Sequence, residues 1–294
     1  MKQPLSRKEK RPVIPLAFST NAYTKHRLAD ACERIAAAGY RAVEILADVP
    51  HAYPGPELAA TAKRLAERVR SLGLAVVAMN ANTLMGYWKP FPKELTFEPS
   101  LITRDDAERN ARILLIEAVM AHAHTFGAPV VTITTGQPLS GEPPAVLRER
   151  LLGGLERLVR AADLTGIDLA IETEPGQFIE TSPALVELLD EVDHPRLGAN
   201  LDIGHAACMG EDPADSVRLL GRRLRHLHLE DIQNRRHYHL IPGLGDVDFA
   251  SVRRALDEVG YSRAAAVELY TYADEPDRAA RESFAALSPL FPAE

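Results

Sequence analysis

The sequence alternates eight times between short apolar segments and longer helical segments, and this alternation limits the folds that the chain can adopt. The apolar segments carry β-branched or other apolar residues without strict period-two alternation, as expected for strands buried on both faces. They cover residues 13–18, 41–46, 74–79, 129–134, 168–173, 197–202, 224–229 and 264–269. Segments with helical periodicity lie between them, and several end at a glycine in the C-cap position, as in 26–39, 56–73 and 145–166.

Eight strand–helix units in 294 residues predict an α/β protein that folds as a single (β/α)8 TIM barrel. The competing fold is a doubly wound open sheet, which places a glycine-rich phosphate-binding turn after the first strand. The segment AFSTNAYT at residues 17–24 has no such turn. We therefore assign residues 13–294 to one catalytic barrel domain and the basic residues 1–12 to a disordered tail.

Charge and cysteine content narrow the partners and the compartment. The formal net charge of −7 argues against nucleic acid or an anionic membrane as the partner, and no segment is apolar enough to span a bilayer. Cys32 and Cys208 are the only cysteines and form no CxxC pair, which fits a reducing compartment. We expect a cytoplasmic protein that acts on a small molecule, and a homo-oligomer stays open.

Acidic residues and histidines stand at the C-terminal ends of several predicted strands, where the chemistry of TIM barrels is located. They are Glu44, Glu172, Glu174, Asp202, His205, His226, His228, Glu230, Asp231 and Glu268. A single acidic residue at a barrel rim usually belongs to a surface salt bridge. Several carboxylates at one register on adjacent strands instead require a compensating cation, because each buried unpaired carboxylate is costly.

Glu172, Asp202, His228 and Glu268 together form an oxygen-rich set of ligands with one imidazole. This set suits a divalent cation, with Mn²⁺ preferred and Mg²⁺, Co²⁺ or Zn²⁺ as alternatives, and the lack of thiolates argues against a structural zinc. His205 follows Asp202 by three residues. It is interpreted as a substrate contact or as a hydrogen-bond partner of a ligand.

Further residues are predicted to contact the substrate around the metal. One group follows the seventh strand in the segment QNRRHYHLIPG, and another follows the second, third and fifth strands. Together with His205, the predicted contacts are Glu174, Arg235, His237, His239, Asn80, Trp88 and Glu44. Trp88 lies in the long aromatic segment 80–100, which either covers the active face as a lid or packs on the barrel rim.

Five motifs follow one another in the second half of the chain: IETEPG, NLDIGHA, HLHLED, PGLGDVDF and VELY. In this order and spacing they resemble the xylose isomerase-like TIM barrel superfamily, in particular its sugar phosphate isomerase/epimerase branch with the ketose 3-epimerases. The first half resembles that branch through its alternation and through GYRAVEI at 39–45. The resemblance implies that Glu172, Asp202, His228 and Glu268 bind a metal, and that Glu172 and Glu268 also move protons as catalytic residues. It assigns Gly243–Asp248 a structural turn.

The segment with His237 and His239 departs from simple epimerases. Trinuclear-zinc apurinic endonucleases of the same superfamily carry an Asp-x-His ligand pair in a similar position, but they also need histidines after strands three and four. Those strands end in NANT and TTGQP here, so a three-zinc cluster is not expected. His237 and His239 could bind substrate, bind a second ion, or be solvated loop residues.

We therefore predict a divalent-metal-dependent isomerase or epimerase of a sugar, keto-sugar or polyol. It would work through a metal-stabilised enediolate, with two glutamates as acid and base. The same chemistry serves dehydratases and lyases, and a catalytically silent sugar-binding barrel would keep the ligands without proton transfer. An endonuclease-like metal hydrolase is disfavoured because the chain shows no basic face. No lysine stands at a strand end, which disfavours a Schiff-base aldolase.

Overall fold

The computed structural model describes residues 12–139 and 141–292, and its strands close into a barrel in the order β1 to β8. Every neighbouring pair is parallel, and β1 pairs with β8 to complete the ring. The strands are β1 Leu16–Ser19, β2 Ala42–Leu46, β3 Ala75–Asn80, β4 Val130–Ile133, β5 Asp168–Glu172, β6 Leu197–Asp202, β7 Leu224–Leu229 and β8 Ala265–Val267. Each predicted strand overlaps one of them, and the predicted (β/α)8 barrel is confirmed.

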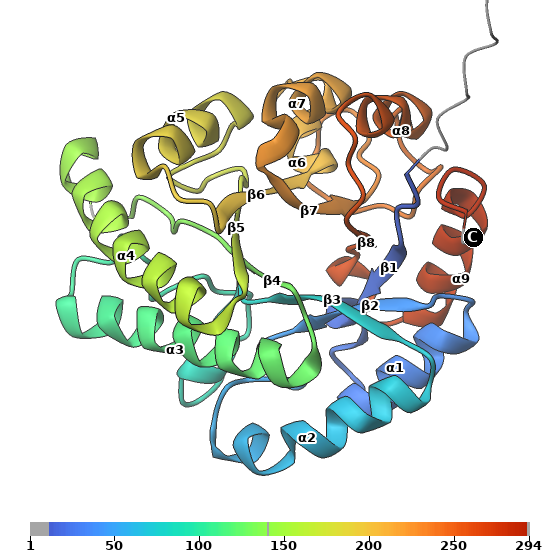
Figure 1. The fold of residues 1–294 in the computed structure, drawn as a ribbon, viewed down its shortest axis with the longest axis horizontal. Coiled ribbons are helices and arrows are strands. Elements are labelled where there is room, and N and C mark those ends of the chain that lie inside the picture. The colour runs from blue at the N-terminus through green and yellow to red at the C-terminus, as the bar shows by residue number, and fades with distance from the viewer. Residues whose placement is uncertain (1–11, 140, 293–294) are drawn as a thin grey trace, which may run out of the picture.

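Helices surround the strands, as the view down the barrel in Figure 1 shows. The α-helices are α1 Leu28–Ala37, α2 Pro56–Ser71, α3 Asp106–Phe126, α4 Pro144–Thr165, α5 Ser182–Val192, α6 Ile203–Cys208, α7 Pro213–Leu220, α8 Phe249–Glu258 and α9 Pro276–Leu287. Short 3-10 helices cover Thr20–Tyr23, Met85–Tyr87, Gly221–Arg223 and Tyr270–Tyr272. Among the described residues, no helix combines the length and hydropathy needed to cross a membrane.

The predicted disordered tail falls almost entirely outside the described residues, which begin at Pro12. The carbonyl of Pro12 accepts a hydrogen bond of 2.8 Å from Arg253 on α8. The last residue of the predicted tail is therefore attached to the barrel, because this bond ties it to a helix of the outer ring.

Small side chains fill one level of the barrel interior and polar side chains fill the next. Ala17, Ala42 and Ala266 are buried together and lie opposite one another on β1, β2 and β8. Because alternate residues of a strand point to the same face, Glu44 and Glu268 follow on the same interior face two residues later. The strands therefore carry charged groups into the barrel at its C-terminal end.

Candidate metal centre

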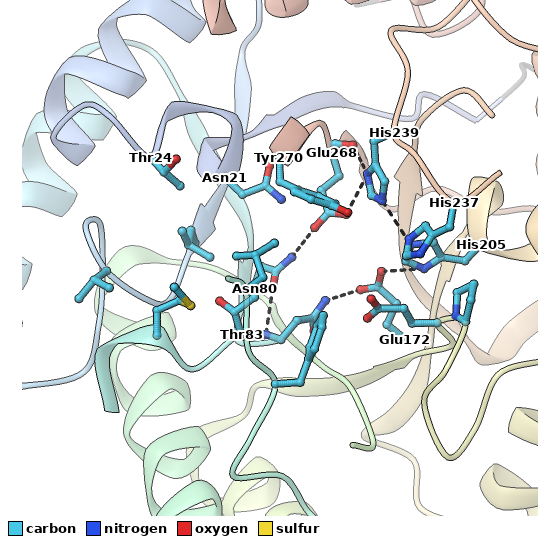
Figure 2. A pocket seen from close by; sticks show the side chains of 18 of the residues that line it. Asn21, Thr24, Asn80, Thr83, Glu172, His205, His237, His239, Glu268 and Tyr270 are labelled. Carbon is cyan, nitrogen blue, oxygen red and sulfur yellow. Dashed lines mark hydrogen bonds and ion pairs between the residues drawn. The ribbon is translucent and has the colours of Figure 1, made fainter. Parts of the chain in front are cut away.

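A cavity of about 590 Å³ opens above the C-terminal ends of the strands (Figure 2). Predicted site residues that line it are Asn80, Glu172, Glu174, His205, His237, His239 and Glu268. Asp202 and His228 are fully buried and do not line it. Apolar residues of the loop after β3 form another part of its wall, namely Met85, Phe91, Leu95 and Phe97.

The four predicted metal ligands come together from β5, β6, β7 and the residue after β8. Each of them offers one donor atom within 4.8 Å of the donors of the other three. His228 Nδ1 lies 3.3 Å from an oxygen of Glu172, 3.6 Å from one of Glu268 and 3.9 Å from one of Asp202. Donors bound to one cation at about 2.0–2.2 Å are spaced in this way. The geometry therefore fits a shared cation.

Asp202 gives a direct test of whether this set suits a cation. Its Oδ1 accepts hydrogen bonds of 2.7 Å from the Gly204 amide and 3.0 Å from the His205 amide, and so caps α6. Its Oδ2 faces His228 and has no hydrogen-bond partner, although the side chain is fully buried. Buried carboxylate oxygens are rarely left alone. A cation at this point would satisfy the orphaned oxygen, and the oxygen-rich donors suit Mn²⁺, Mg²⁺, Co²⁺ or Zn²⁺.

The protonation states of the four proposed ligands depend on one another. Burial lowers the pKa of His228, but the carboxylates of Glu44, Glu268 and Glu172 outweigh burial and raise it well above its ordinary value. The pKa of Glu268 is raised well above its ordinary value, mainly by burial. The positive charge of His228 lowers this pKa, whereas the carboxylate of Glu172 raises it further. The metal-free site therefore holds protons where a divalent cation would otherwise supply the positive charge.

Amide side chains hold one oxygen of each glutamate that lines the centre. Glu172 Oε2 accepts hydrogen bonds of 2.6 Å from Asn82 and 2.8 Å from Asn200. Glu268 Oε1 accepts one of 2.9 Å from Asn80, as Figure 2 shows. Asn82 and Asn200 were not predicted as site residues. The alternation of side chains along a strand could have indicated both, because residues two positions apart point to the same face. Asn82 follows Asn80 by two positions, and Asn200 precedes Asp202 by two.

Three histidines form a second cluster on one side of the cavity (Figure 2). His205 Nε2 lies 3.1 Å from His237 Nε2 and 3.4 Å from His239 Nε2. His205 Nδ1 donates to the Thr173 carbonyl at 3.0 Å, and His239 Nδ1 donates to the Glu268 carbonyl at 2.9 Å. The Nε2 atoms therefore converge, and this cluster also has donor atoms close enough to hold a cation.

Three predicted substrate contacts do not line the cavity. Glu44 is fully buried beneath the ligands, where it bonds to His226 and His228. Its carboxylate is bonded to these two histidines of β7, and Glu44 is absent from the cavity lining. The Trp88 indole nitrogen instead donates to the Glu98 carbonyl at 2.8 Å within its own loop. Arg235 is exposed and lies outside the lining.

Comparisons with known proteins identify the family of this chain. The family model described as "Xylose isomerase-like TIM barrel" matches residues 32–290. The chain is 26% identical to the fructoselysine 3-epimerase of Escherichia coli O157:H7 over 272 residues, covering 91% of this chain and 94% of that enzyme. It is 28% identical to the inosose dehydratase of Geobacillus thermodenitrificans over 177 residues, covering 49% of this chain and 59% of that enzyme.

Solved structures share the fold at lower identity. The structure described as IOLI protein with a binding zinc atom superposes with a TM-score of 0.77 at 19% identity. It covers 95% of this chain and 98% of its own. The match of the family model over residues 32–290 confirms, at the level of the family, the resemblance predicted from the motifs of β5 to β8.

Proposed function

Because this chain belongs to the xylose isomerase-like TIM barrel family, we propose that it is a divalent-metal-dependent isomerase or epimerase of a sugar or keto-sugar. The observation that carries this proposal is the convergence of three carboxylates and His228, with the buried Asp202 Oδ2 left without a partner. The epimerase relative supports the reaction class, and the zinc atom described for the IOLI protein, which shares this fold, supports a metal-binding barrel.

A divalent cation held by Glu172, Asp202, His228 and Glu268 would supply Lewis acidity that stabilises the enediolate of a keto-sugar. Glu172 and Glu268 reach the cavity from β5 and from the end of β8. One removes the α-proton and the other returns it. The asparagine amides hold one oxygen of each glutamate, which keeps both carboxylates oriented while the other oxygen stays available for the site.

The lining favours an uncharged substrate. Among the described residues, none of those lining the cavity is a lysine or an arginine, whereas Glu172, Glu174 and Glu268 all line it. A phosphate or carboxylate on the substrate would meet this acidic lining without a compensating cationic side chain. Asparagines and histidines of the lining offer hydrogen bonds to hydroxyl groups instead. We therefore propose a neutral polyol or keto-sugar.

A dehydratase is the second candidate, because the inosose dehydratase relative aligns with half of this chain. Both reactions begin with removal of the proton next to a carbonyl. They differ afterwards, since a dehydratase expels a neighbouring hydroxyl group while an epimerase returns the proton. Product analysis separates the two, because only dehydration changes the mass of the substrate.

The test combines metal analysis with exchange of the substrate's α-hydrogen in deuterated water, on a panel of ketoses, keto-sugars and inososes. We expect one Mn²⁺ per chain and exchange with at least one neutral substrate. Glu172→Gln and Glu268→Gln should keep some metal yet lose exchange by a factor of about 10²–10⁴, because an amide cannot accept the proton. Asp202→Asn should lose metal, and excess Mn²⁺ should partly restore its exchange.

Two outcomes would contradict the proposal. If the chain binds no cation at saturating concentrations of the metal, the proposed metal-dependent reaction is wrong. A chain that binds a cation and a sugar, yet exchanges no hydrogen with any member of the panel, would instead be a sugar-binding barrel without catalysis.

A further inference from the structure

Glu44 is a buried charged group that the proposed reaction does not use. It lies on β2 inside the barrel, fully buried, and does not line the cavity. Its Oε2 is 2.8 Å from His226 Nε2 and 2.9 Å from His228 Nε2, both on β7 across the barrel. Burying a carboxylate at this depth costs free energy unless the group is paired and hydrogen-bonded.

These bonds determine which nitrogen of His228 faces the other ligands. A carboxylate can only accept, so Nε2 of His228 carries the proton that it donates to Glu44. The remaining ring nitrogen, Nδ1, points to the opposite side, 3.3 Å from Glu172 and 3.6 Å from Glu268. When a cation displaces protons from the site, Nδ1 is thus the nitrogen that can bind it.

Glu44 is also linked to a second ligand. Asn80 Nδ2 lies 3.4 Å from Glu44 Oε1 and 2.9 Å from Glu268 Oε1, so one amide spans both carboxylates. The carboxylate on β2 is therefore connected to His228 directly and to Glu268 through Asn80.

We propose that Glu44 is a positioning residue for the metal, which holds His228 so that it binds the cation through Nδ1. This inference rests on the proposed metal binding. His226 shares the same oxygen of Glu44 and fixes the carboxylate from a second direction. Carboxylates that accept from a metal-bound histidine orient the ring and raise its basicity, and their loss typically weakens metal binding by about 10–100-fold.

Glu44→Gln is the main variant, because glutamine keeps the size but removes the charge and one acceptor oxygen. We expect its Kd for Mn²⁺ to rise by about 10–100-fold, with turnover recovering at saturating Mn²⁺. The matched control is Asp48→Asn, the same exchange at an equally buried carboxylate that follows the same strand. Asp48 bonds to the backbone of Met85 and Gly86 and to Thr83, so Mn²⁺ affinity should stay unchanged.

A second measurement does not depend on a variant. Nitrogen NMR of ¹⁵N-histidine in the wild-type protein loaded with Mg²⁺ or Zn²⁺ reports which nitrogen of His228 carries the proton. We expect a protonated Nε2 and a metal-bound Nδ1. If Glu44→Gln fails to fold, this measurement decides alone.

Three results would overturn the inference: a metal-bound Nε2, unchanged Mn²⁺ affinity in Glu44→Gln, or equal losses in Glu44→Gln and Asp48→Asn. If the wild-type chain binds none of these cations, the proposed function fails as well. If it binds them and Glu44→Gln binds Mn²⁺ as tightly as the wild type, the proposed function stands and the proposed role of Glu44 is wrong.

Discussion

His51, which follows β2, is a buried side chain that contributes to the loss of stability of this barrel in acid. It is only 8% exposed, and its Nε2 lies 3.2 Å from the carbonyls of both Tyr23 and His26. Burial lowers the pKa of His51 from 6.5 to about 4, although these backbone hydrogen bonds raise it in part. The folded protein therefore keeps this ring neutral at a pH at which the unfolded chain protonates it.

The sign of the effect follows from proton binding. Below a pH of about 6.5 the unfolded state binds more protons than the folded state, so stability is lost as the pH falls towards 4. We expect His51 to cost on the order of 3 kcal/mol of unfolding free energy over this range. In His51→Gln this loss is absent, so urea titrations should show the cost of the substitution shrinking between pH 7 and pH 4. The exposed His124→Gln is the control, and a cost for His51→Gln that stays constant with pH would contradict the prediction.

Single residues were predictable where a motif fixed both their type and their strand position. Glu172, Asp202, His228 and Glu268 were predicted as one ligand set, and their donor atoms converge in the structure. Glu44 was placed on the correct strand, but its depth in the barrel depends on partners about 180 residues away on β7. No local pattern contains such a contact.

At the scale of elements, the loop between β7 and α8 is folded around Asp231. Asp231 accepts hydrogen bonds of 2.8 Å from the amides of both Gly243 and Gly245 and one of 3.1 Å from that of Val247. A Cβ at Gly245 would lie 2.4 Å from Asp231 Oδ1, so the close approach requires glycine. This arrangement agrees with a structural role for Gly243–Asp248, and it supports the loop segment that carries the histidines of the cavity.

His237 and His239 flank Tyr238 in this loop, and this alternation supplies a matched control. Both histidines line the cavity, whereas Tyr238 is 55% exposed and does not. We expect His237→Ala and His239→Ala to raise the Kd for substrate by about tenfold, the loss of roughly one hydrogen bond. Tyr238→Ala should bind substrate normally. Metal content should stay constant in all three variants, as measured by elemental analysis alongside substrate titration.

A change of metal content in a histidine variant would assign a different role to the loop between β7 and α8. If either histidine variant loses one equivalent of metal while the Tyr238 variant does not, the histidine cluster holds a second cation rather than substrate alone.

The loop after β3 was less predictable than the loop between β7 and α8. Its sequence could not decide between a lid and a rim loop, because its path depends on contacts such as that of Trp88 with Glu98. In the structure, Phe91 and Leu95 line the cavity while Trp88 stays within the loop.

At the scale of the whole molecule, the barrel closure assembles a site that no single segment contains. The four proposed metal ligands stand at four consecutive strand ends, β5 to β8, and the asparagines that hold the glutamates stand at the end of β3, just after it and on β6. The alternation of strands and helices, together with the missing glycine-rich turn after the first strand, was sufficient to predict this closure over a doubly wound open sheet. The amide contacts across the barrel were not predictable, since they arise only once the ring is closed.

Because the site exists only in the closed barrel, a cation bound there should stabilise the whole fold. A ligand that binds only the native state adds about 2.7 kcal/mol of unfolding free energy at 100 times its Kd. We expect Mn²⁺ to produce this gain in urea titrations of the wild-type protein and EDTA to reverse it. Asp202→Asn should abolish the gain, because it removes the carboxylate with the orphaned oxygen. Glu258→Gln on the surface of α8, which breaks only an exposed ion pair with Arg218, should retain it. A gain of the same size in Asp202→Asn would place the cation outside this centre.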